Sequence, residues 1–73
     1  MNKYTAYLTS SLVEQLALLV ICDYGLTMLD ALSLVYNSQW YEKVTDVDTG
    51  LYIQSAAYNY RLLRHEVAFG KVV

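Results

Sequence analysis

The sequence has few charged residues, a single cysteine and no proline. Only 16% of its 73 residues are charged, and the formal net charge of −2 argues against a nucleic-acid binder that relies on bulk positive charge. One cysteine excludes an internal disulfide framework, and the lack of CxxC and Cys/His clusters excludes a structural zinc site. Because proline is absent, only glycines and capping residues limit the helices.

Apolar side chains are abundant by comparison. They make up 56% of the chain, and eight of the aromatic residues are tyrosines. This composition excludes intrinsic disorder, and the length allows one small domain, residues 1–73. A chain this short keeps a large share of its surface in contact with solvent, so its apolar surplus predicts that a second chain covers part of it.

No segment of the sequence reads as a membrane span or a signal peptide. The longest unbroken apolar run is Leu16 to Cys22, seven residues against the roughly 20 that a spanning helix needs. Glu14 would lie inside the hydrophobic region of a signal peptide, and no small-residue cleavage site follows. We therefore expect a cytoplasmic protein without membrane contact, with Cys22 as a small buried residue on a helix.

Apolar spacing predicts a first helix over about Tyr4 to Asp23, which Gly25 ends. The pair Ser11 and Glu14 also matches a capping box, so the regular helix begins either near Tyr4 or at Ser11. From Leu16 onward the apolar positions surround most of the cylinder. A helix of this kind lies at the centre of a fold or at an interface.

Capping residues divide the rest of the chain. Thr27 begins a second helix that runs to about Tyr36, and Ser38 begins a short third one, residues 39–45. Ser55 begins the last helix, residues 56–69, which Gly70 ends. The second helix is expected to bury Leu29, Leu32, Val35 and Tyr36. The third helix carries Trp40, Tyr41 and Val44, and an apolar stripe on the last helix consists of Ala56, Tyr60, Leu63 and Val67.

Between the third and last helices, Asp46 to Gly50 is typical of a turn, and Leu51 to Gln54 is short and β-prone. The predicted fold class is therefore all-α, a small bundle of three to four helices with a short extended segment at residues 51–54. A strand of this kind would need a partner from a second chain.

The most polar part of the sequence is Arg61 to Glu66. Helical ribonuclease toxins place four to six residues between an arginine and a histidine, but only three separate Arg61 from His65. The alternative is a cationic helix end that complements the helix dipole. His65 and Glu66 are adjacent, so they point about 100° apart on a helix and do not converge easily on one substrate.

Other catalytic or ligand-binding patterns are weak. Asp46 and Asp48 lack the further oxygen ligands of a cation loop and fit a turn in which aspartates bond their own backbone. The sequence contains no nucleophile elbow and no glycine-rich phosphate loop. We expect no enzymatic activity, no metal and no cofactor.

The tyrosines suit either a core or a protein interface, where a ring with one hydroxyl gives large contact area at low entropic cost. The candidate partner-binding residues are Trp40, Tyr41, Tyr52, Tyr58, Arg61 and Arg64. The expected partners are a second copy of the chain in a homodimer, with the first helix or residues 51–54 at the seam, and another protein. Nucleic acid is the less favoured partner, because Trp40 and Tyr41 neighbour Glu42 and the acidic turn.

Several aromatic and turn motifs resemble a family of short uncharacterised bacterial proteins common in gut anaerobes. They are Tyr36-Asn37-Ser38, Trp40-Tyr41, Asp48-Thr49-Gly50-Leu51-Tyr52, Gln54-Ser55 and Tyr58-Asn59-Tyr60. The resemblance covers roughly residues 10 to 66. It implies a cytosolic bacterial domain with no established activity to transfer, and proximity of some members to toxin-like genes implies an antitoxin or accessory subunit.

The sequence thus favours a small non-catalytic protein–protein interaction module. The alternative is a nucleic-acid-binding regulator that uses Arg61 and Arg64 of the last helix.

Overall fold

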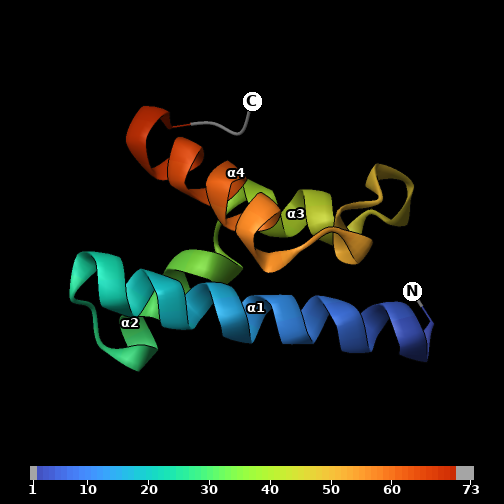
Figure 1. Ribbon diagram of the computed structural model, residues 1–73, viewed down its shortest axis with the longest axis horizontal. Coiled ribbons are helices and arrows are strands. Elements are labelled where there is room, and N and C mark those ends of the chain that lie inside the picture. Colours follow the sequence, from blue (N-terminus) through green and yellow to red (C-terminus); the bar gives the residue numbers. More distant parts are fainter. Residues whose placement is uncertain (1, 71–73) are drawn as a thin grey trace.

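The computed structural model describes residues 2–70, which fold into four α-helices and two short 3-10 helices, with no strand among them (Figure 1). In chain order the elements are α1 (Lys3–Tyr24), α2 (Met28–Tyr36), α3 (Gln39–Thr45), η1 (Val47–Thr49), η2 (Leu51–Ile53) and α4 (Ala56–Phe69). The predicted all-α class is confirmed. In Figure 1, α4 lies on one side of the long helix α1, and α2 crosses α1 from the other side.

Helix α1 begins at the earlier of its two expected starts. The side-chain oxygen of Asn2 accepts a hydrogen bond from the Thr5 amide at 2.8 Å, so the helix is capped there and passes through Ser11 without a break. Gly25 ends it in the left-handed conformation, where a Cβ would be strained. The predicted boundaries of α1 therefore agree with the structure to within one residue.

The buried face of α1 is narrower than the apolar spacing indicated. It consists of Thr5, Thr9, Leu12, Val13, Leu16, Ala17 and Val20. The prediction of a buried Cys22 is wrong, since this residue is exposed. Two residues correspond to a rotation of about 200°, so Cys22 points away from the core that Val20 enters. The helix therefore presents part of its apolar surface to solvent.

The caps of α2 and α3 are the predicted ones. The Thr27 hydroxyl accepts from the Asp30 amide at 3.1 Å, and the Ser38 hydroxyl accepts from the Tyr41 amide at 3.0 Å. The burial expected for α2 is partly wrong: Leu29 is 78% exposed and Tyr36 is 50% exposed. A nine-residue helix that rests on α1 buries only one narrow stripe, here Ala31 and Val35.

Residues 51–54 do not form the expected extended segment. Leu51–Ile53 is a 3-10 turn in which the Ile53 amide donates to the Gly50 carbonyl and the Gln54 amide donates to the Leu51 carbonyl. These local bonds satisfy the backbone without a partner strand. In the preceding turn, the Asp46 carboxylate accepts from the Asp48 amide at 3.1 Å, which confirms the self-bonded turn.

A single cluster of buried side chains forms the core, with Trp40 the largest of those that are fully buried. Leu16 and Val20 of α1, Val35 of α2 and Leu63 of α4 belong to the same cluster. The described residues form a compact helical globule with a radius of gyration of 11.4 Å. By length and composition alone, α1 is able to cross a membrane, but 39% of the relevant stretch is buried inside this globule, and core helices pass the same test.

Candidate protein-binding surfaces

Trp40 is not a surface residue, which corrects its prediction as a partner-binding aromatic. Its side chain is completely buried, and its indole N–H donates to the Asn59 side-chain oxygen at 2.9 Å. The Asn59 amide nitrogen in turn donates to the carbonyls of Leu51 at 3.1 Å and Ser55 at 3.0 Å. Asn59 therefore ties α3, η2 and the start of α4 together, and sequence reasoning missed it because an asparagine gives no apolar signal.

Glu66 has a structural task that its position beside His65 does not reveal. Its two carboxylate oxygens accept from the backbone amides of Gln39 at 2.8 Å and Trp40 at 2.9 Å. The carboxylate thus caps α3, where unpaired amides and the helix dipole favour negative charge. The neighbouring His65 packs its ring against Phe69, with the two centroids 4.6 Å apart.

Tyr60 connects α4 to the C-terminal end of α1. Its hydroxyl donates to the Asp23 carboxylate at 2.6 Å. Burial raises the pKa of Tyr60, and the hydrogen bond to Asp23 and the negative charge of Asp23 raise it further. The Arg64 guanidinium carbon lies 5.9 Å from the centre of the same ring. Tyr60 is thus a structural donor that stays protonated at physiological pH.

The remaining predicted site residues do not form one patch. Tyr58, Arg61 and Arg64 are exposed on α4. Tyr41 is half-buried on α3 and meets Tyr36 edge-on, with the ring centroids 5.1 Å apart and the planes at 72°. Tyr52 is half-buried in η2, beside α1. Of the predicted site residues, therefore, only those on α4 share one exposed surface, whereas Tyr41 and Tyr52 make separate contacts elsewhere.

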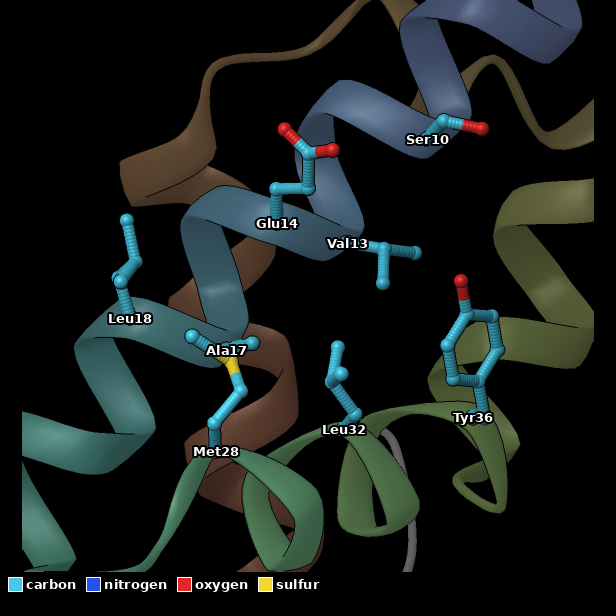
Figure 2. Close-up of a pocket in the computed structure, with 8 residues that line it drawn as sticks. All are labelled: Ser10, Val13, Glu14, Ala17, Leu18, Met28, Leu32 and Tyr36. Carbon is cyan, nitrogen blue, oxygen red and sulfur yellow. The ribbon is translucent and has the colours of Figure 1, made fainter.

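An open groove of about 540 Å³ runs between α1 and α2 (Figure 2). Its lining residues are Ser10, Val13, Glu14, Ala17, Leu18, Met28, Leu32 and Tyr36. Val13 and Ala17 are buried and form the floor, whereas Leu18 is 55% exposed and Met28 is 50% exposed. Glu14 is the only charged residue of the lining. The groove is thus a mainly apolar channel with one carboxylate at its edge.

The sequence carried a signal for this groove. Met28, Leu32 and Tyr36 are spaced four residues apart, so they lie in one line along α2, next to the line of Ala31 and Val35 that enters the core. Two adjacent apolar lines on so short a helix exceed what one packing partner covers. The spacing predicts burial for Leu32, Val35 and Tyr36 alike, because the sequence does not say which line faces α1.

A second hollow, about 350 Å³, lies between the N-terminal half of α1 and η2. Its lining includes the exposed Tyr4 and Ile53 together with polar Gln15, Gln54 and Ser55. Polar side chains interrupt its apolar surface, so it offers a less continuous apolar contact than the groove between α1 and α2.

Among residues 2–70 no group of three or more histidine, cysteine or acidic side chains is placed to hold a metal ion. Comparisons of the chain with protein-family models, with curated proteins and with solved structures gave no match. The resemblance to short bacterial proteins therefore stays a prediction, and any function has to be argued from the surfaces described above.

Proposed function

We propose that this protein is a small, non-catalytic interaction module that binds protein through the groove between α1 and α2. The observation that carries the proposal is the groove itself, an apolar channel whose walls are exposed although its floor belongs to the core. Small soluble domains rarely leave a continuous apolar surface of this kind uncovered, and such surfaces mark binding sites.

The distribution of exposed apolar side chains supports this location. Within residues 2–70, thirteen large apolar side chains are exposed, and eight of them lie on α1 or α2. Those eight are Tyr4, Tyr7, Leu18, Leu19, Tyr24, Met28, Leu29 and Tyr36. A line of side chains four residues apart on each side of a channel suits an amphipathic helix, which enters such grooves with anchors at the same spacing.

The proposal includes the setting in which the module works. It places the protein in the cytoplasm and gives it either a second copy of itself or another protein as partner. The antitoxin-like or accessory-subunit role implied by the bacterial resemblance is its most concrete form. The Arg61 and His65 side chains have no catalytic part in it.

The solution mass of the protein tests the proposal. We expect light scattering over a hundredfold range of concentration to give more than one chain for the wild type. Leu18→Glu places a charge on the groove wall and should return the mass to that of one chain, because a desolvated carboxylate opposes association. Leu29→Glu is the matched control, since Leu29 is 78% exposed on α2 but does not line the groove.

Two results would contradict the proposed self-association through the groove. One is a wild-type mass of one chain at every concentration. The other is a larger mass that Leu18→Glu leaves unchanged, which would place the interface elsewhere.

The exposed arginines of α4 favour a second candidate function, a regulator that binds nucleic acid. Arg61 and Arg64 are exposed on the same helix and are able to contact phosphates. A fluorescence-anisotropy titration with mixed DNA and RNA at low salt measures this directly. Binding that falls when both arginines are replaced by alanine supports the regulator, and flat titrations remove it.

A further inference from the structure

The solvent-exposed face of α4 carries aromatic and basic side chains that the packing of the core does not require. Tyr58 and Phe69 are exposed near its two ends, with Phe69 71% exposed, and Arg61 and Arg64 are exposed between them. Glu66, the only acidic residue of α4, is bound to the amides that begin α3. The outer face of α4 therefore shows solvent an aromatic and cationic surface.

The groove between α1 and α2 has the opposite charge. Glu14 is the only charged residue of its lining. The segment from Lys3 to Tyr36 contains Asp23 and Asp30 besides Glu14, and Lys3 is its only basic residue. An arginine that reaches Glu14 from another chain would meet a carboxylate with no basic neighbour among the lining residues. Electrostatic complementarity of this kind steers and orients association.

The two surfaces also agree in size. Phe69 follows Tyr58 by eleven positions, about 17 Å along a helix, and Tyr36 follows Met28 by eight positions, about 12 Å. The aromatic ends of α4 therefore span the wall of the groove, and the arginines lie between them, as Glu14 lies between the ends of the groove. A helix is a common occupant of such a channel.

One molecule is unable to join these surfaces to each other. In Figure 1, α4 lies on one side of α1 and α2 crosses α1 from the other side, and in Figure 2 the ribbon of α4 passes behind the groove. The α4 outer face and the groove therefore point in different directions, and they meet only when two molecules associate.

We propose that the groove between α1 and α2 binds the outer face of α4 from a second copy of this chain, with Arg61 of that copy paired to Glu14. This inference rests on the proposed function, because it names the occupant of the same groove. The contact uses two different surfaces, so a pair of molecules keeps one free groove on one copy and one free α4 on the other. Such a heterologous contact builds rings or open chains of copies rather than a two-fold dimer.

Two charge reversals test the proposal, measured by light scattering at low salt. Glu14→Arg disables the groove and Arg61→Glu disables the α4 face, so each variant alone should have the mass of one chain. Mixed in equal amounts, they should assemble again, because every contact between unlike variants joins opposite charges, whereas contacts between like variants join like charges. The double variant Glu14→Arg/Arg61→Glu restores opposite charges and should assemble again.

Matched controls come from α3. Glu42→Arg and Lys43→Glu reverse exposed charges outside both surfaces and should leave the wild-type mass unchanged. Circular dichroism of each variant establishes that it is folded, which is expected because Glu14 and Arg61 are both exposed.

The outcomes separate this inference from the proposed function. If Leu18→Glu abolishes assembly but Arg61→Glu does not, the groove is an interface and α4 is not its occupant. If both charge reversals give single chains but their mixture does not assemble, the head-to-tail contact is overturned as well. A wild type that stays a single chain overturns the inference together with the proposed self-association.

Discussion

The two halves of this molecule are held together by different means. In the half formed by α3, η2 and α4, polar side chains join residues far apart in sequence: the buried Asn59 bonds to Trp40, and the half-buried Glu66 bonds to the start of α3. In the half formed by α1 and α2, apolar packing joins the helices, and one side of the contact stays open as the groove.

The difference shows where substitution should damage the fold and where it should damage binding. Buried hydrogen bonds require specific geometry, and a partner left unpaired costs free energy, so the α3–α4 half tolerates little change. An apolar wall exposed to solvent contributes little to the fold. Trp40 and Asn59 thus have a structural task in the core, whereas the groove has no comparable task within the described chain.

The largest expected effect is that of Asn59→Ala. It leaves the buried indole N–H of Trp40 without its partner and removes the side-chain bonds to the carbonyls of Leu51 and Ser55, which keep only their backbone bonds, so the free energy of unfolding should fall by about 3 kcal/mol. Urea unfolding measures the loss. The control Asn37→Ala removes an exposed asparagine and should cost less than about 1 kcal/mol. Equal losses in the two variants would show that the buried hydrogen bonds of the α3–α4 half contribute no more to stability than an exposed one.

Gly50→Val tests the turn that joins η1 to η2. Gly50 has φ of 69°, and a Cβ built on it meets nothing within 4 Å. The cost is therefore backbone strain alone, about 1–2 kcal/mol. Thermal unfolding should show a lower melting temperature, with a smaller shift for Gly50→Asn because asparagine tolerates this conformation. An unchanged melting temperature for Gly50→Val would refute the argument.

Tyr60→Phe should cost about 1 kcal/mol at pH 7, because it removes the hydrogen bond to Asp23. This stabilising effect of the Tyr60 hydroxyl is lost at high pH. The folded-state pKa of Tyr60 is raised above the ordinary value of 10.0, so its contribution to stability is complete below about pH 10 and is lost as the pH rises further.

The wild type and the Tyr60→Phe variant should therefore approach each other in stability as the pH rises above about 10. Urea unfolding at a series of pH values measures the gap. A gap that stays constant across this range would show that the Tyr60 hydroxyl does not couple folding to pH.

The smallest expected effect on stability is that of Leu18→Glu, which tests whether the groove wall serves binding and not the fold. Leu18 is 55% exposed, so the substitution should change the free energy of unfolding by less than about 0.5 kcal/mol while it abolishes association. Urea unfolding at a concentration where the protein is a single chain checks the first part. A loss above about 2 kcal/mol would mean that the groove wall belongs to the core.

The sequence alone predicted the fold class and nearly all helix boundaries. Thr27, Ser38 and Ser55 cap the helices that follow them, as their residue types indicated, because a capping side chain bonds an amide only two or three residues away. Local chemistry of this kind needs no information about the rest of the fold.

Exposure and long-range pairing were decided by the tertiary structure. Trp40, expected at the surface, is buried, whereas Leu29 and Cys22, expected inside, are exposed. Glu66 caps a helix that begins 27 residues earlier in the chain. An apolar period shows that a helix has a side to bury but not which of two adjacent lines meets its neighbour, because that depends on the crossing of helices distant in sequence. The groove between α1 and α2 exists for this reason.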